Sequence, residues 1–288
     1  MPDPTSPLSA VVTCKGRLAH LKETLPLLMS LPLREVVVVD YDCPDGAGAW
    51  VSKSFPRATL VKVTERPQFN ASEARNLGAA AAAAHWLLFI DADTRVNAGF
   101  WDEIVGKLEP GVFIVAQPRV PELVGTFVTA QPDFEALGGF DEIMQGWGGE
   151  DTDFLERLEM LGRRRAYYDA RLATPISHGD DLRTRHHRVS NPQRSGLLNN
   201  LYRTVKNDLG RQGVTPSAQA RRDLYAQLSR ALGAEAPAKS YEVAFRQASI
   251  SGMTLSASLK YELTAPGAGA APTGAMRAAS AGEKAGDG

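Results

Sequence analysis

Two acidic stretches contain the residue types best suited to metal and proton chemistry. The first is Asp91-Ala92-Asp93, which directly follows the apolar run at residues 86–90. The second, residues 146–154, combines glycines and a tryptophan with three carboxylates. Carboxylate oxygens are ligands that Mg²⁺ and Mn²⁺ prefer, and a carboxylate can also take a proton from a hydroxyl group. Together the two stretches indicate metal-assisted transfer from a phosphorylated donor to a hydroxyl acceptor.

The first 95 residues carry the pattern of a parallel α/β sheet. The four consecutive valines of residues 36–39 fit a strand that is buried on both faces. Strand, helix and strand in alternation predict a mostly parallel, right-handed sheet, whose ligands bind beyond the carboxyl ends of the strands. We expect strands at residues 8–13, 35–40, 59–63 and 86–90, with helices at 18–28, 49–54 and 70–84. Asp91 and Asp93 then lie at the ligand-binding edge.

The pattern changes after residue 95. We expect helices at residues 98–108 and 151–161, and strands at 112–117, 124–129, 165–168 and 173–177. The predicted organisation is a domain of residues 1–190, with a donor half (1–95) and an acceptor half (96–190). A helical extension follows over residues 191–263. Residues 264–288 lack the apolar side chains that offset the entropy of ordering, so we expect a disordered tail.

Composition limits the classes of partner and the compartment. A net charge of −1 gives no electrostatic footprint for nucleic acid. The two cysteines cannot build a disulfide framework, so we expect reduced thiols in a cytoplasmic protein. The first residues lack the features of a signal peptide, and the longest apolar stretch contains His85. We therefore predict a soluble protein without a transmembrane segment, and leave peripheral membrane association and oligomeric state open.

The acidic residues also have structural interpretations. Asp91 and Asp93 can cap the following helix, and the carboxylates at residues 150–153 suit a helix N-terminus. Capping alone does not account for the neighbouring glycines and tryptophan. Asp40 and Asp42 can contact a nucleotide or serve the turn around Pro44, and the sequence favours neither.

The basic residues and histidines have alternatives of the same kind. Arg75 can reach a diphosphate or an acidic neighbour, or it can be solvated. His178 can be a metal ligand, although a surface histidine at a strand end is the commoner case. We interpret the basic run at residues 183–188 as a solvated face, and no other histidine has a comparable setting.

The motifs resemble those of family 2 of the GT-A-fold glycosyltransferases. The second half is similar to the galactosyltransferase region shared by bacterial chondroitin polymerases and animal β-1,4-galactosyltransferases. The matching motifs, in the family's order, are Thr13-Cys14-Lys15-Gly16-Arg17, Val39-Asp40, Ala74-Arg75-Asn76-Leu77-Gly78, Asp91-Ala92-Asp93, Gly138-Gly139-Phe140-Asp141-Glu142, Trp147-Gly148-Gly149-Glu150-Asp151 and His178. They span roughly residues 8–180.

This resemblance implies a role for each matching position. It makes Asp93 and His178 ligands of Mn²⁺ or Mg²⁺ and Asp151 the catalytic base. It assigns the donor to Thr13, Arg17, Asp40, Asp42, Arg75, Asp91 and Ala92, and the acceptor to Trp147, Gly148 and Glu150. The implied reaction is an inverting, metal-dependent transfer from a nucleotide sugar, above all a UDP-sugar, to a glycan or other hydroxyl acceptor.

Two other functions use similar sequence features. A nucleotidyltransferase needs a glycine- and lysine-rich phosphate loop after the first strand, and residues 14–17 are poor in glycine. A binding protein for carbohydrate or nucleotide sugar would keep the fold without turnover, and the presence of Asp93, Asp151 and His178 argues against it. A dinucleotide-binding oxidoreductase needs a Gly-x-Gly-x-x-Gly motif that the first turn lacks.

Overall fold

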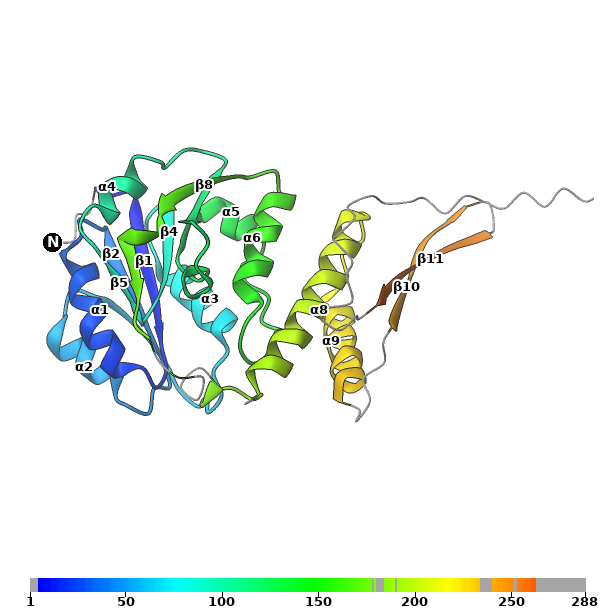
Figure 1. Ribbon diagram of the computed structural model, residues 1–288, viewed down its shortest axis with the longest axis horizontal. Coiled ribbons are helices and arrows are strands. Elements are labelled where there is room, and N and C mark those ends of the chain that lie inside the picture. The colour runs from blue at the N-terminus through cyan, green and yellow to red at the C-terminus, as the bar shows by residue number, and fades with distance from the viewer. Residues whose placement is uncertain are drawn as a thin grey trace, which may run out of the picture. The chain divides into compact units, whose positions relative to one another are not determined.

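The central feature of the fold is a mixed sheet with helices on both faces (Figure 1). The computed structural model describes residues 5–177, 179, 184–189, 191–233, 240–250 and 253–262. The chain divides into two units, Met1–Ala234 and Glu235–Gly288. In the first unit the described strands form a seven-stranded sheet of order β3-β2-β1-β4-β7-β6-β8.

The first half of the chain builds the parallel part of this sheet. Its strands are β1 (Leu8–Cys14), β2 (Glu35–Tyr41), β3 (Thr59–Val63) and β4 (Trp86–Asp91), and its helices are α1 (Leu18–Ser30), α2 (Ala47–Ser54) and α3 (Ala71–Ala81). Residues 36–39 of β2 are fully buried, as the run of valines predicts. Asn70 caps α3 by accepting the backbone N–H of Glu73 at 3.1 Å. The predicted alternation of strands and helices is confirmed.

The second half adds strands of both directions. The elements are β5 (Thr94–Val96), α4 (Phe100–Val105), β6 (Val112–Gln117), the 3₁₀ turn η1 (Pro121–Leu123), β7 (Phe127–Ala130), α5 (Gln131–Ala136), α6 (Glu150–Met160), β8 (Arg164–Asp169), the 3₁₀ turn η2 (Ala170–Leu172) and β9 (Ala173–Pro175). β7 runs antiparallel to β4 and β6, whereas β6 and β8 are parallel. The sequence did not predict β5 or α5, because elements of three and six residues are too short to show a period.

Two hydrophobic layers hold the helices against the sheet. One lies under α1, α2 and α4, and the other under α3, α5 and α6 (Figure 1). The second layer contains a cluster of five packed rings, of Phe89, Phe127, Phe134, Phe140 and Phe154. Phe140 precedes the glycine- and tryptophan-containing stretch, and Phe154 lies in α6. The cluster therefore joins the sheet to both segments that carry the second acidic motif.

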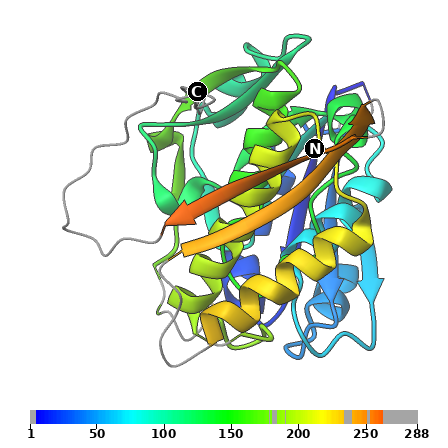
Figure 2. The same cartoon turned by 90° about the vertical axis from the view of Figure 1, so that its right-hand side faces the viewer.

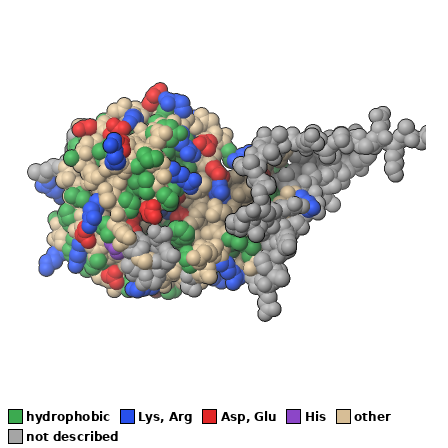
Figure 3. All heavy atoms as spheres, viewed as in Figure 1, with side chains coloured by type: hydrophobic (Ala, Val, Ile, Leu, Met, Phe, Trp, Pro, Cys, Tyr) green, Lys and Arg blue, Asp and Glu red, His purple; other side chains and the backbone are tan. Residues whose placement is uncertain are grey.

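Two further helices, α8 (Pro192–Arg211) and α9 (Ala218–Gly233), form an outer layer beyond α6 (Figures 1 and 2). Both helices fall within residues 191–263, the range of the predicted helical extension. None of the described helices is long and apolar enough to cross a membrane. Acidic and basic side chains are interspersed on the described part of the face in Figure 3, as a net charge of −1 leads one to expect.

The second unit contains an antiparallel hairpin of β10 (Ser240–Ile250) and β11 (Met253–Glu262). The prediction of helix up to residue 263 is therefore wrong for these strands. Apolar residues alternate at positions 241, 243 and 245 and again from 253 to 261, which is the period of a strand. The predicted disordered tail, residues 264–288, lies outside the described residues.

Truncating Phe154 tests the role of the ring cluster. Phe154 is fully buried and stacks on Phe140 with ring centroids 4.6 Å apart. Phe154→Ala should lower the free energy of unfolding by about 3–5 kcal/mol, measured by urea denaturation. The control is Leu77→Ala on α3, where the side chain is 37% exposed and the expected change is within about 0.5 kcal/mol. Equal effects of the two substitutions would contradict the proposed packing role.

Candidate active site

A cleft of about 580 Å³ opens at the carboxyl ends of β1 and β4. Its walls come from the turn after β1, from α3, from the end of β4, from η1 and from the first turn of α6. Most of the site residues expected from the sequence line it together: Thr13, Arg17, Arg75, Asp91, Ala92, Asp93, Trp147, Gly148, Glu150 and Asp151. His178 lies outside the described residues.

Arg75 on α3 links the two acidic motifs. Its guanidinium donates to Asp91 at 3.0 Å and to Glu150 at 3.2 Å, and it also lies 3.2 Å from Asp151. The side chain is 7% exposed, with the ring of Phe140 5.4 Å away on its flank. The solvated alternative for Arg75 is therefore wrong in this structure, because one buried cation holds three carboxylates of two walls.

Burial and neighbouring charges act against each other in this cluster, and the net effect raises the pKa of Arg75, Asp151 and Asp91. Burial alone would lower the pKa of Arg75, but Asp151, Asp91 and Glu150 raise it, so the guanidinium stays charged. Burial raises the pKa of Asp151 well above its ordinary value although Arg75 acts against it. Burial raises the pKa of Asp91 in the same way. Oδ1 of Asp151 is buried and ion-paired with Arg75 at 3.2 Å, but it accepts no hydrogen bond from the described residues. A carboxylate whose pKa is raised in a cleft is a candidate for a general base.

The end of β4 places its two carboxylates apart. Asp91 faces Arg75 and packs against Gly125, where an added Cβ would lie 2.5 Å from Oδ2 of Asp91. Asp93 points to the opposite wall and pairs with Arg17 from the turn after β1. Gly125 is thus a residue that the sequence analysis missed. The backbone of Gly125 lies too close to Asp91 for any side chain, and a single sequence does not reveal such an approach.

The residues present fit a hard divalent cation whose coordination is completed by oxygen atoms of a substrate. Asp91 and Asp93 supply carboxylate oxygens at one end of the cleft, and Mg²⁺-type sites use one or two carboxylates together with substrate phosphates. No group of three or more His, Cys, Asp or Glu side chains close enough to hold a metal occurs within the described residues. A third protein ligand at His178 remains a prediction.

Asp40 and Asp42 do not lie along the cleft. Asp40 accepts the backbone N–H groups of Cys43 at 3.1 Å and Gly48 at 3.0 Å, so it orders the turn into α2. Asp42 accepts the N–H of Arg66 at 3.0 Å. In this structure both carboxylates serve turn chemistry, and a nucleotide contact stays a prediction.

The histidines at residues 186 and 187 were misjudged from the sequence. Both line the cleft, so the interpretation of residues 183–188 as a solvated face is wrong for these two. The backbone N–H of Phe69 donates to the carbonyl of His186 at 2.7 Å, and the ring of Phe69 packs edge-on to His187. These long-range contacts leave no periodic signal in a sequence.

Side chains of α8 hold the backbone of the loop at residues 145–149, which lines the cleft. Asn199 donates to the carbonyls of Gly148 at 2.7 Å and Gln145 at 3.1 Å. Ser195 donates to the carbonyl of Trp147 at 3.0 Å. Trp147 itself is 40% exposed. The loop that presents this ring and leads into Asp151 is therefore positioned by the C-terminal helices.

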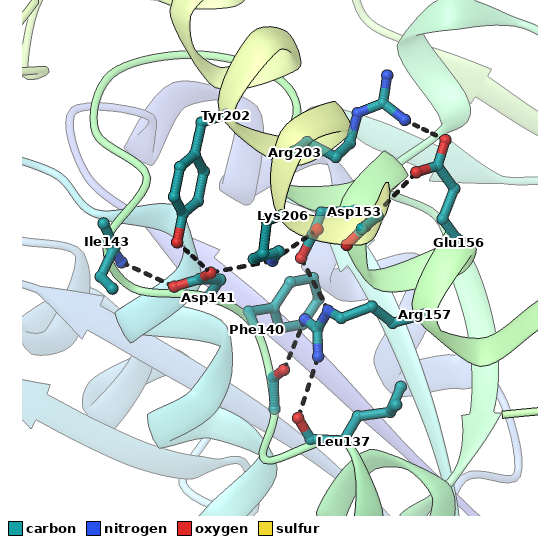
Figure 4. A network of polar contacts seen from close by, with 12 residues as sticks. Leu137, Phe140, Asp141, Ile143, Asp153, Glu156, Arg157, Tyr202, Arg203 and Lys206 are labelled. Atoms are coloured by element: carbon teal, nitrogen blue, oxygen red, sulfur yellow. Dashed lines mark hydrogen bonds and ion pairs between the residues drawn. The ribbon is translucent and has the colours of Figure 1, made fainter. Parts of the chain in front are cut away.

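An ionic cluster beneath this loop fixes α8 to α6 (Figure 4). Lys206 lies 2.9 Å from Asp141 and 2.7 Å from Asp153, and all three side chains are almost fully buried. Burial alone would raise the pKa of Asp141, but Lys206 lowers it below its ordinary value. Arg157 joins Asp153 to the carbonyls of Leu137 and Gly139. The cluster thus ties both ends of the loop to one helix pair.

The model of glycosyl transferase family 2 matches residues 9–170, more than half of the chain. The chain therefore belongs to this family and is a glycosyltransferase. No curated protein matches it.

Solved structures agree on the GT-A type of fold. The mannosyltransferase PcManGT from Pyrobaculum calidifontis, in complex with GDP-Man and Mn²⁺, is 18% identical with a TM-score of 0.53, over 80% of this chain and 71% of that one. S. aureus TarS 1-349 with UDP-GlcNAc is 16% identical with a TM-score of 0.55, over 77% and 71%. GalNAc-T7 with UDP, GalNAc and Mn²⁺ is 13% identical with a TM-score of 0.53, over 77% and 54%.

Replacing Lys206 tests the ionic cluster. Lys206→Met removes the shared cation of Asp141 and Asp153 and leaves them paired only with Arg221 and Arg157, so it should lower the free energy of unfolding by about 3 kcal/mol, the lower end for a broken buried ion pair. The control is Arg164→Met, which removes the exposed pair of Arg164 and Glu109 and should cost at most about 1 kcal/mol. Denaturant titration of both variants measures the difference. A Lys206 variant as stable as the control would contradict the assigned role.

Proposed function

We propose that this enzyme transfers a sugar from a nucleoside-diphosphate sugar, with UDP as its nucleotide, to a hydroxyl group of a glycan or similar acceptor with inversion. The observation that carries the proposal is the convergence of the two acidic motifs on Arg75, across one cleft. It brings Asp91, from the Asp91-Ala92-Asp93 motif, onto the same cation as Asp151, whose pKa is raised well above its ordinary value. The complexes of similar folds with UDP-GlcNAc, GDP-Man and Mn²⁺ support a nucleotide-sugar donor.

On the donor side, Arg17 is the cation best placed to meet a diphosphate. Lys15 is already occupied, because its ammonium donates to the carbonyls of Tyr41, Asp42 and Arg66 at 2.7–3.1 Å. Arg17 instead pairs with Asp93 at the cleft wall. We assign the diphosphate to Arg17 and keep Thr13, Ala92, Asp40 and Asp42 as candidates for contacts with the donor.

Asp91 and Asp93, with His178 as a further candidate, would hold the divalent ion. When bound, a Mn²⁺ or Mg²⁺ ion supplies Lewis-acid stabilisation of the negative charge that develops on the departing diphosphate. Arg75 orients Asp91 by its hydrogen bond and counteracts the burial that raises the pKa of this carboxyl group. These contacts pre-organise the carboxylates before the donor arrives.

On the acceptor side, Asp151 acts as the base. The acceptor oxygen attacks C1 of the donor sugar, the bond from C1 to the diphosphate oxygen breaks, and the carboxylate of Asp151 takes the hydroxyl proton. Attack from the face opposite the leaving group inverts the anomeric centre in one displacement. Glu150, Trp147 and Gly148 form the wall beside the acceptor, in keeping with the galactosyltransferase-type resemblance of residues 138–151.

A nucleotide panel tests the donor site. UDP with Mn²⁺ at roughly 100 times its Kd should stabilise the protein by about 2.7 kcal/mol relative to the unliganded protein, seen as a thermal shift. GDP, dTDP and CMP at the same concentration should stabilise it less. Asp93→Ala should remove the dependence of UDP binding on Mn²⁺. The control is Asp169→Ala, which removes an aspartate from the end of β8, outside the cleft. Mn²⁺-dependent UDP binding that persists in Asp93→Ala would contradict the assigned ligand set.

Asp151→Asn tests the base. The substitution should leave UDP affinity unchanged but lower kcat for transfer roughly 10²- to 10⁴-fold, since the amide cannot take the proton. Asp102→Asn, an exposed aspartate in the first turn of α4, is the control. The base works only when ionised, so in the wild type kcat/KM should fall as the pH decreases through the raised pKa of Asp151. That acidic limb should lie above the ordinary value of 3.8. Full activity of Asp151→Asn would eliminate the assignment.

A further inference from the structure

The two thiols of the chain lie beside each other under the donor side of the cleft. Cys14 is the last residue of β1, and Cys43 follows the end of β2 by two residues. These strands are parallel neighbours, with Cys14 opposite Asp40 in the register. Their ends bring the two sulfur atoms to a hydrogen-bonding distance of 4.0 Å, with both cysteines free. This pairing plays no part in the transfer reaction.

The surroundings of the two sulfurs differ. Cys43 is half-buried and its sulfur accepts the backbone N–H of Gly16 at 3.2 Å. The pKa of Cys43 is lowered to about 6, first by the hydrogen bond from Cys14 and then by the backbone N–H groups of Gly16, Asp45 and Ala47, while burial acts against them. Cys14 is fully buried, and its hydrogen bond to Cys43 together with burial raises its pKa. Cys43 is thus a thiolate near neutral pH, with a protonated partner beside it.

We propose that Cys14 and Cys43 form a redox modification site, in which a hydroperoxide converts the two thiols into a reversible disulfide. The Cys43 thiolate attacks the peroxide oxygen and becomes a sulfenic acid, while the peroxide leaves as hydroxide and takes a proton to give water. The sulfur of Cys14 then attacks the sulfenic sulfur, and a second water leaves with the thiol proton. The balance is two thiols and one hydrogen peroxide to one disulfide and two waters.

Closing this bond changes the turn that carries Arg17. A disulfide requires a sulfur–sulfur distance of about 2.05 Å, so the sulfurs must approach by nearly half of their present 4.0 Å separation. The turn from Thr13 to Arg17 and the loop at Cys43 must share this movement. Gly16 has a left-handed backbone with φ +66° and is hydrogen-bonded to the moving sulfur. The disulfide therefore displaces Arg17 from Asp93 and weakens donor binding. This consequence, unlike the disulfide itself, rests on the proposed function.

The first measurement concerns the modification alone. Purified wild-type protein is treated with hydrogen peroxide, its remaining thiols are alkylated, and its mass and peptides are analysed. We expect loss of both alkylation sites, a peptide linking Cys14 to Cys43, and full recovery of the thiols with dithiothreitol. Sulfinic acid on Cys43 without a linked peptide, or two thiols that stay alkylatable, would overturn the proposal. Cys43→Ser should keep its Cys14 thiol alkylatable after the same treatment.

The second measurement concerns the donor site. UDP affinity in the presence of Mn²⁺ is compared before and after peroxide for the wild type, Cys14→Ala and Cys43→Ser, each against its own reduced form. The wild type should lose roughly tenfold in affinity, about 1.4 kcal/mol, while neither variant changes. A linked wild type with unchanged affinity would overturn the connection to the donor site. Failure of the reduced wild type to bind UDP would count against the proposed function, and the peptide result would still decide the disulfide.

Discussion

The buried guanidinium of Arg75 is the interaction on which the site depends. Three carboxylates, from the end of β4 and the first turn of α6, surround this one cation within 3.0–3.2 Å. Without it they would repel one another in a cleft largely shielded from water, and the two walls would not hold their separation. Because one positive charge meets three negative ones, the cluster stays short of positive charge. A divalent cation would supply the missing positive charge, whereas a neutral ligand would leave the carboxylates uncompensated.

A second constraint lies behind the acceptor wall. The loop at residues 145–149 has few side chains that can anchor it in the core, since Trp147 is exposed and the neighbouring glycines have no side chains. Its backbone carbonyls are instead held by Asn199 and Ser195 of α8. At Gly149, with φ +98°, an added Cβ would lie 2.9 Å from Cβ of Asn199, so the loop and the helix are in direct contact. The helices that follow the family-matched region therefore belong to the architecture of the site.

The sequence predicted what local pattern controls and missed what distant contacts control. Four valines in a row and a strand that ends on Asp91 are local signals, and they located β2, β4 and the acidic edge correctly. The partners of Arg75, the close approach at Gly125 and the position of His187 depend on segments that meet only after folding. The apolar alternation of β10 and β11 was present in the sequence. The helical pattern of the preceding residues was nevertheless extended over these strands, so they were predicted as helix.

The turn after β1 lies between the pair of thiols and the carboxylate of Asp93. It is fixed from one side by Lys15, whose ammonium reaches three backbone carbonyls, and from the other by the sulfur of Cys43 beneath Gly16. At its end, Arg17 reaches the carboxylate of Asp93. Lys15 cannot move without leaving a buried ammonium unpaired, so displacement of the turn is concentrated at Gly16, which has no side chain of its own and packs against the ring of His186. A change at the sulfur is therefore transmitted to Arg17 rather than absorbed by the strand, because β1 is paired on both sides, with β2 and with β4.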